Sequence, residues 1–425
     1  MEYYNTYTSE YGCALKNNRR TYKIKLELLT DQERTIGEIV RDLDITQGQI
    51  TVTYERIVRR SCSLGLININ NKYRPDKNSA FWVNRKFKLY LGVEAGENIY
   101  WWSQGIYYTQ SASMADYHTV QIQGVDKGGA MNGTIKTGML DYQYIIPIQP
   151  MANAFKDLLA VKIGSTDFVV RGNMKMGGDK VLDCKPPIID MAYYKTNLPY
   201  EISADTNSYI GDLVDKLADM YAADAYYDTE GNFRFTPTLE DECKPVIWEF
   251  DNLHSSFEGV NYTLTLDGEN TMCVYTNATG IKNVSYTAYN TNPLSPINID
   301  TGIRRGSSQE IEYLYEVDGE AVTETQMTKY CRSTANYYLR KNSMISMQLS
   351  FNAPIIPHLD VDKAIEITDE YMDFDHEKFI IQSITFPFNS QAMNVSCTNV
   401  NWIPNSFEYD GKAEIIENEE TQEGA

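Results

Sequence analysis

The sequence predicts an α+β protein that is mainly β, and three observations lead to this class. Short segments in which apolar and polar residues alternate recur along the chain between turn residues, as in strands with one buried face. Tyrosine is abundant, at 32 residues against 14 phenylalanines, and its ring suits strand faces that stay partly wet. Only a few segments carry the helical period. Many short strands at this spacing indicate barrels or sandwiches.

Composition narrows the classes of function. With 425 residues, of which 42% are hydrophobic, the chain is long enough for two or three folded domains. Its 58 acidic and 38 basic residues give a formal net charge of −20. A surface of this sign repels phosphate, so we do not expect nucleic-acid binding through counterion release.

The cysteines and the N-terminal residues indicate the cellular compartment in which the chain folds. The seven cysteines lie far apart without a Cys-x-x-Cys pair, so neither a disulfide framework nor a zinc ribbon is expected. The first residues lack the basic and apolar regions of a signal peptide, and no apolar run approaches the roughly 18 residues that span a bilayer. We therefore expect a chain with no membrane-spanning segment that folds in a reducing cytoplasm.

The N-terminal part is predicted to be an arm followed by a β domain. Residues 1–19 are polar, tyrosine-rich and without a clear period, which indicates a peripheral arm that orders only against a neighbour. Residues 20–148 form the first predicted β-barrel domain, which begins with the alternating segment Thr21–Leu29. Its other expected strands are residues 50–58, 81–93, 99–109 and 117–124.

Residues 149–240 predict an inserted α/β domain. Apolar residues at helical spacing predict a helix over residues 208–222, with Ser208 as its N-cap. These apolar residues are Ile210, Leu213, Val214, Leu217 and Tyr221. The period then changes to alternation on both sides of a turn that contains Gly231, which predicts a hairpin over residues 225–235.

Residues 241–405 predict a second β-rich domain with one helix, residues 324–341. Thr323 and Gln326 have the spacing of a capping box at its start. The apolar stripe of this helix is Met327, Cys331, Ala335, Tyr338 and Leu339. Clear alternation marks strands at residues 345–351 and 393–397. Residues 406–425 carry seven acidic residues and are expected to be an acidic flexible tail.

Two segments could hold ligands. Gly172–Lys180 has the glycines of a phosphate-binding loop, but Gly178 and Asp179 stand where that loop needs Lys and then Ser or Thr, so we favour an ordinary hairpin or loop. The acidic cluster 369–377 could supply oxygen ligands to calcium, although it lacks the glycine and the final acid of the 12-residue calcium loop. Its members are Asp369, Glu370, Asp373, Asp375, His376 and Glu377. A calcium site and a solvated loop both stay open, and we favour the loop.

No arrangement typical of catalysis is apparent. The histidines are His118, His254, His358 and His376. No histidine lies at metal-ligand spacing from another, and none adjoins a Gly-x-Ser-x-Gly elbow. We expect His118 to lie in a strand and His358 to lie in a loop. Paired carboxylates for glycoside hydrolysis stay open among 58 acids.

Aromatic residues offer one further possibility. Trp101–Trp102 and Tyr107–Tyr108 could form a sugar-stacking platform, but neighbouring strand residues face opposite sides, so core and interface roles are favoured. We therefore assign no catalytic, cofactor-binding or metal-binding residues and predict that the protein is not an enzyme.

Motifs along most of the chain occur in a characteristic order. They are Thr119–Lys127, Ile146–Pro147, Leu198–Ile202, Gly211–Leu213, Tyr226–Pro237, Asn290–Ile299, Pro357–Asp362 and Ile381–Ile384. Through these motifs, residues 20–402 resemble the central hub protein of tailed-phage and prophage baseplates and tail tips. The resemblance implies two related tube-type β-barrel domains, an inserted α/β domain and smaller insertions in each subunit.

The resemblance also implies a function. Three subunits would present six barrels around a channel and adapt the sixfold tail tube to a threefold tip. Such a hub is a structural virion protein of the tail tip or baseplate, made in the host cytoplasm, without a cofactor. No domain-sized sequence follows Trp402, which favours a purely structural hub. The alternative kept open is a tail-associated cell-wall hydrolase or a carbohydrate-binding receptor module.

The implied partners are other virion proteins. They are two sister copies in a homotrimer, tail-tube or distal-tail ring proteins above, and a tip, fibre or lysin protein below, with the tape measure protein as a further candidate. DNA would pass transiently without specific binding. The acidic balance fits such a channel and fits equally an acidic outer surface that keeps the protein soluble.

Overall fold

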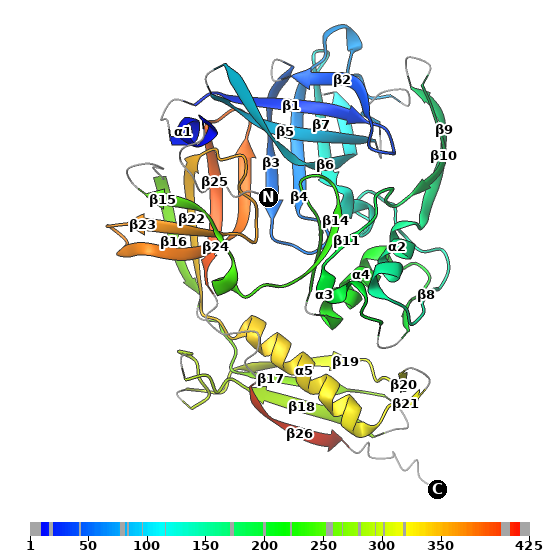
Figure 1. Cartoon of the computed structure of the whole chain (residues 1–425), viewed down its shortest axis with the longest axis vertical. Coiled ribbons are helices and arrows are strands. Elements are labelled where there is room, and N and C mark those ends of the chain that lie inside the picture. The colour runs from blue at the N-terminus through cyan, green and yellow to red at the C-terminus, as the bar shows by residue number, and fades with distance from the viewer. Residues whose placement is uncertain are drawn as a thin grey trace.

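The structure is mainly β, as predicted, with several sheets and few helices (Figure 1). The computed structural model describes residues 10–16, 20–41, 44–76, 81–82, 85–95, 97–114, 116–170, 174–198, 201–221, 223–251, 258–265, 267–278, 282–293, 295–300, 302–317, 320–400 and 409–416. No helix in these ranges is long and apolar enough to cross a membrane.

One 13-stranded sheet contains strands from both predicted barrel regions. From the first region come β1 (Tyr22–Leu29), β2 (Thr35–Arg41), β3 (Ile45–Thr53), β4 (Arg60–Ile67), β5 (Lys86–Ala95), β6 (Asn98–Met114) and β7 (Thr119–Asp126). From the second come β15 (Val246–Asp251), β16 (Glu258–Thr265), β22 (Ser346–Pro354), β23 (Ala364–Asp369), β24 (Phe374–Pro387) and β25 (Ala392–Asn399). Its path is β16-β22-β25-β24-β3-β4-β7-β6-β5-β1-β2, with β23 on β24 and β15 on β23.

The two halves meet where β24 pairs antiparallel with β3, for example Ile384 with Val52. This pairing uses edges that two separate barrels would each need for closure. Among the described residues no pairing joins the β2 end of the path to the β16 end, so two closed barrels are not seen. The halves share one apolar core, in which Leu64, Phe351 and Ile384 are fully buried.

A short helix in the predicted N-terminal arm packs on this core. Helix α1 (Glu10–Lys16) places Tyr11 and Leu15 among the buried residues of the sheet. For residues 10–16, the expectation that the arm orders only against a neighbour is therefore wrong, because two of its apolar side chains are covered within the chain. The other residues of 1–19 lie outside the described ranges.

A second core belongs to the predicted inserted region, below the right side of the large sheet in Figure 1. We call these elements the helical module: β8 (Tyr144–Ile146), α2 (Met151–Leu159), β9 (Lys162–Val170), β10 (Met174–Val181), β11 (Ile188–Ile189), α3 (Met191–Tyr194), β12 (Ile202–Ala204), α4 (Ile210–Met220), β13 (Ala223–Tyr227) and β14 (Phe233–Pro237). The predicted helix and hairpin are confirmed as α4 and β13–β14. The predicted cap is wrong: the N-cap is Tyr209, whose backbone N–H donates to Asp212 Oδ2 at 2.8 Å, whereas Ser208 lies one residue earlier.

A third layer lies at the bottom of Figure 1. Helix α5 (Glu324–Asn342) crosses a four-stranded sheet of order β19-β17-β18-β26 and has its own apolar core. The strands are β17 (Thr271–Thr276), β18 (Asn283–Tyr289), β19 (Gly306–Ile311) and β26 (Asp410–Ile416), and the hairpin β20 (Glu316–Val317) and β21 (Glu320–Ala321) precedes α5.

The prediction for the start of α5 is confirmed, and one for the C-terminus is not. Thr323 N donates to Gln326 Oε1 at 2.9 Å, and Gln326 N donates to Thr323 Oγ1 at 3.3 Å, as a capping box requires. Residues 410–416, expected within an acidic tail, form β26 because their backbone pairs with every residue of β18. Charge alone did not reveal a strand whose side chains are exposed but whose backbone completes a sheet.

Candidate functional site

The glycine-rich segment 172–180, for which we favoured a hairpin or loop over a phosphate-binding loop, is part of a β-hairpin where it is described. Met174–Val181 is strand β10, paired antiparallel with β9. A phosphate loop instead joins a strand to the N-terminus of a helix. Gly172 and Asn173 lie outside the described residues.

The acidic cluster 369–377 forms the turn between β23 and β24. Asp369 Oδ1 accepts hydrogen bonds from the backbone N–H groups of Tyr371 at 2.7 Å and Met372 at 3.1 Å, so this carboxylate shapes the turn. His376 Nδ1 lies 3.3 Å from Glu249 Oε1 and 3.7 Å from Glu366 Oε2. These contacts connect the cluster with β15 and β23, and within the described residues the oxygens of the cluster do not converge on one point.

The histidines are separated in the structure. His118 is exposed in a bend before β7, so its expected place in a strand is wrong; a hydrogen bond from its backbone N–H to Asp116 forms the bend. His358 lies in a turn, as predicted, where its Nδ1 is 3.0 Å from the hydroxyl of Tyr11 and its ring contacts Trp102 and Trp248. Burial among these rings lowers the pKa of His358 to about 4, so its imidazole is neutral at pH 7. His254 lies outside the described residues.

The aromatic platform is divided between two cores. Tyr107 belongs to the core of the large sheet and Tyr108 to that of the helical module, and both side chains are fully buried. Trp102 contacts His358, while Trp101 on the opposite face is 37% exposed. A sugar could therefore not stack on these residues together.

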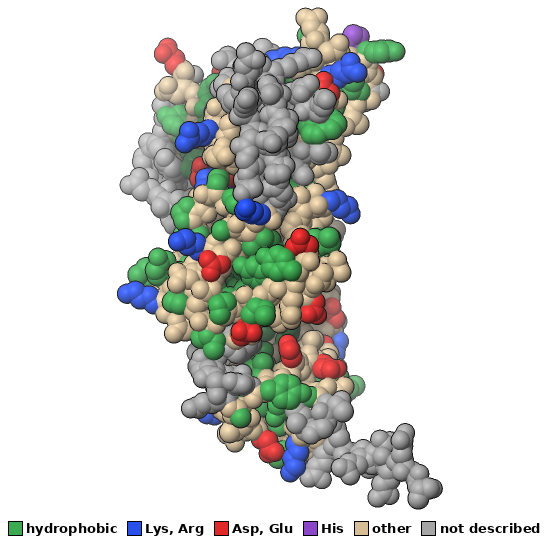
Figure 2. Space-filling model, turned by 90° about the vertical axis from the view of Figure 1, so that its right-hand side faces the viewer, with side chains coloured by type: hydrophobic (Ala, Val, Ile, Leu, Met, Phe, Trp, Pro, Cys, Tyr) green, Lys and Arg blue, Asp and Glu red, His purple; other side chains and the backbone are tan. Residues whose placement is uncertain are grey.

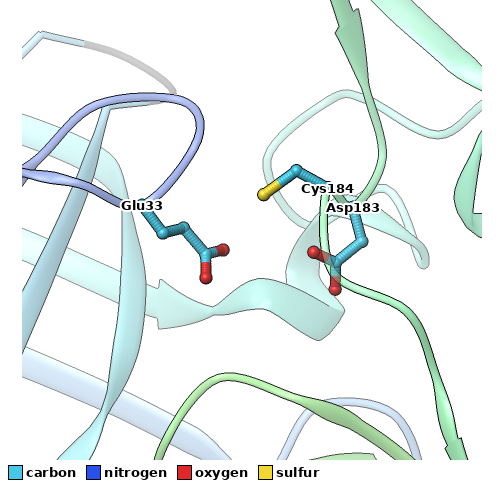
Figure 3. A group of neighbouring side chains, drawn as sticks. All are labelled: Glu33, Asp183 and Cys184. Atoms are coloured by element: carbon cyan, nitrogen blue, oxygen red, sulfur yellow. The ribbon is translucent and has the colours of Figure 1, made fainter.

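A buried ionic cluster, which the sequence did not predict, joins the large sheet to the helical module. Glu33 lies in the turn between β1 and β2, whereas Asp183 and Cys184 follow β10 (Figure 3). Glu33 Oε1 contacts the ammonium groups of Lys127 at 2.6 Å and Lys86 at 2.9 Å. The side chains of these three residues are at most 2% exposed.

Two more contacts complete this cluster. Lys127 also donates to Asp183 Oδ1 at 2.7 Å, and Lys185 lies 2.8 Å from Glu33 Oε2. Although burial favours the neutral acid, Lys86 and Lys127 hold the pKa of Glu33 at about 2, so it remains a carboxylate. Burial lowers the pKa of Lys127, against the opposing effect of Asp183.

Glu33, Asp183 and Cys184 also have the composition of a metal site, since their ligand atoms lie within 4.8 Å of one another (Figure 3). Three ammonium groups already contact the two carboxylates. A divalent cation would have to displace these lysines from a buried position, at a large electrostatic cost. The donor set therefore fits an internal ion-pair network rather than a metal.

A second buried network connects the two halves of the sheet with the hairpin of the helical module. Asp126 Oδ2 accepts from the backbone N–H groups of Arg59 and Arg60, each at 2.8 Å. The Arg60 guanidinium donates to the carbonyl oxygen of Tyr227 at 3.0 Å and to Asp360 Oδ1 at 2.5 Å. Burial raises the pKa of Asp126 to about 6, despite these donors. Both networks hold parts of the chain together that are distant in sequence.

The exposed edge of the sheet is a candidate interface. Strand β16 pairs only with β22 among the described strands, and Tyr262 and Leu264 on it are 44% and 47% exposed. Their cross-strand partners are Leu349, which is 1% exposed, and Met347, which packs against the core. The core-facing side of the sheet therefore continues to its edge without cover. Unpaired strand edges with apolar side chains are templates for another chain.

Hydrophobic side chains also gather on the helical module. Figure 2 shows them across the middle of the face that lies to the right in Figure 1, with acidic side chains below. Ile145 in β8 of this module is 47% exposed, and Met139 and Tyr142, which precede β8 in the sequence, are 55% and 53% exposed. Both surfaces offer exposed apolar contact area.

Solved structures match this architecture over nearly the whole chain. The prophage MuSo2 43 kDa tail protein from Shewanella oneidensis has a TM-score of 0.53 and 14% identity, over 89% of this chain and 98% of that one. The tail protein from Neisseria meningitidis MC58 has a TM-score of 0.55 and 9% identity, over 89% and 96%. The chain has the fold of prophage tail proteins. No protein-family model matches the sequence, and no curated protein matches it significantly.

Proposed function

We propose that this chain is a structural phage tail protein, without enzymatic activity, that forms a homotrimeric hub at the baseplate or tail tip. The observation that carries the proposal is the 13-stranded sheet, whose main path runs through both halves of the chain and ends at β16 and β2. Among the described strands, the outer edges of these two strands and of the branch strand β15 are unpaired. Its fold, shared with prophage tail proteins, supports a tail role.

The two different edges favour a head-to-tail ring. When β16 of one copy pairs with β2 of the next, the interface is heterologous, and such contacts generate a closed ring if the rotation closes. The neighbouring copy would cover Tyr262 and Leu264 and satisfy the edge backbone groups. Each copy contributes two sheet halves, so three copies would supply six tube-like segments that adapt a sixfold tube to a threefold tip.

The remaining assignments follow from this arrangement. The ring would surround a passage through which DNA moves without specific binding, and the net charge of −20 is compatible with low affinity for phosphate. Tail-tube or distal-tail rings would bind above, and a tip, fibre or lysin protein below, with the tape measure protein as a further candidate. The apolar side chains of the helical module offer these partners a surface (Figure 2). We place the assembled protein in the virion.

Mass photometry of the purified chain tests the trimer. We expect a trimeric species whose abundance rises with concentration, and we expect Leu264→Lys to shift it toward monomer, because a lysine at this edge would be buried by the neighbour. Ile303→Lys is the matched control: Ile303 is 85% exposed in the α5 layer, and its substitution should leave the distribution unchanged. Only monomer at all concentrations, also with the ring proteins added, would refute the proposed assembly.

A further inference from the structure

We propose that the helical module binds an extended segment of a partner protein as an added β-strand. The segment would pair with the open edge of residues 139–146, which include β8. It would carry a Lys or Arg opposite Asp141 and an apolar residue opposite Ile145. This surface is separate from the contact between copies through β16 and β2, so the proposal does not depend on the trimer.

The open edge belongs to a two-stranded ribbon on the right-hand side of the molecule in Figure 1, the side that Figure 2 faces. Strand β8 pairs antiparallel with β12, and among the described strands it has no other partner. Before β8, Met139 forms a bridge to Tyr209. This bridge continues the register in which Ile145 pairs with Ser203. Pro147 has no backbone N–H, so it ends the stretch that can pair.

The module holds this ribbon in place before a partner binds. Leu140 and Ile146 on one side of the ribbon and Ile202 on the other are at most 4% exposed and belong to the core of the module. The Lys216 ammonium of α4 donates to the carbonyl oxygen of Ser203 at 3.0 Å. A strand that is already ordered loses little conformational freedom on binding, so this edge is preorganised.

Apolar side chains along the edge are exposed. Met139, Tyr142 and Ile145 are each 47–55% exposed. Edge strands that are protected from pairing carry charged side chains instead, as β26 does with Lys412 and Glu414. The exposed apolar side chains therefore favour a surface that a partner covers.

Charge selects the chemistry of the partner. Residues 139–150 and 197–209, which contain the two sides of the ribbon, include three acidic residues and no basic residue. The acidic residues are Asp141, Glu201 and Asp205, and all three are exposed. Opposite charges directly across paired strands stabilise the pairing, and like charges destabilise it. A segment with a basic residue opposite Asp141 is therefore favoured over an acidic one.

Fluorescence anisotropy with labelled peptides tests the added strand on the purified full-length chain. The probes are two threonine heptapeptides with Arg at the second and Ile at the sixth position, or in the reverse order. Their spacing matches that of Asp141 and Ile145, and the two orders fit parallel and antiparallel pairing. We expect one of the two orders to bind.

Methylation of the peptide backbone shows whether the bound peptide is a strand. Two versions of the bound peptide carry N-methyl groups on the odd or on the even residues. One version should bind at least tenfold more weakly and the other should bind like the parent, because only every second backbone N–H of an added strand points toward the edge. Both versions are measured on the wild-type chain, so the result does not depend on the folding of a variant.

Charge reversal tests the pairing with Asp141. Asp141→Lys should weaken binding of the Arg peptide about tenfold and should favour a peptide with Glu in place of Arg. Glu310→Lys is the matched control, because Glu310 is exposed on β19, which is also an edge strand among the described strands. This control should leave the affinity for both peptides unchanged.

Three results would overturn the proposal. They are no binding of either order of the peptide, equal affinities of the two methylated versions, and a trimer that dissociates in Asp141→Lys. The last result would assign the surface to a contact between copies instead of a separate partner. A chain that stays monomeric under all conditions but binds the peptide as described would contradict the hub assembly alone.

Discussion

Replacing Glu33 with glutamine should destabilise the fold strongly at neutral pH, and the effect should disappear in acid. The substitution preserves size but removes the negative charge from between the buried ammonium groups of Lys86 and Lys127. Breaking a buried ion pair in this way costs about 3–5 kcal/mol. The shift of the Glu33 pKa from 4.5 to about 2 corresponds to about 3 kcal/mol, at about 1.4 kcal/mol for each tenfold change in proton affinity.

The sign of the pH dependence follows from this shift. The pKa of Glu33 is lower in the folded than in the unfolded chain, so its contribution is complete above pH 4.5 and decreases as the pH falls toward 2. The difference in unfolding free energy between wild type and Glu33→Gln should therefore be about 3 kcal/mol at pH 7 and should shrink steadily below pH 4.5.

Urea unfolding, followed by tryptophan fluorescence at a series of pH values, measures this difference. Glu230→Gln is the matched control, because Glu230 pairs with Lys88 at 2.6 Å but its side chain is 55% exposed. Exposed pairs contribute at most about 1 kcal/mol. A Glu33→Gln chain as stable as the wild type at pH 7, or a difference that stays constant between pH 7 and pH 3, would refute the electrostatic reasoning.

Two further predictions concern packing. Ile384→Ala removes a fully buried side chain at the junction of β24 with β3 and should lower the free energy of unfolding in urea by about 2–5 kcal/mol. Both halves of the sheet should still unfold in one transition, and two separate transitions would contradict the shared core. Gly231→Ala should cost about 2–4 kcal/mol, because φ is +73° and the new Cβ would lie 2.6 Å from Ile106 Cδ1; an unchanged thermal midpoint would contradict it.

Features that depend on residues a few positions apart were predicted most accurately from the sequence. The apolar face of α4, the turn at Gly231 and the capping box of Thr323 and Gln326 depend on residues a few positions apart, and all three are present. The β26 strand was missed because its side chains are exposed and polar, and only the partner strand β18 shows that its backbone is paired.

The ionic clusters and the joined sheet depend on distant residues. Lys127 and Asp183 are separated by 56 positions and Arg60 and Asp360 by 300, and no periodicity connects such pairs. The pairing of β3 with β24 is equally remote in sequence, so two barrels and one continuous sheet give the same strand pattern.

Electron cryomicroscopy of the chain assembled with its ring partners tests the central claim most directly. We expect three copies around an axial passage, with β16 of each copy beside β2 of the next and with Tyr262 and Leu264 covered at that contact. An assembly in which these edges remain exposed to solvent, or in which the copies enclose no passage, would contradict the account.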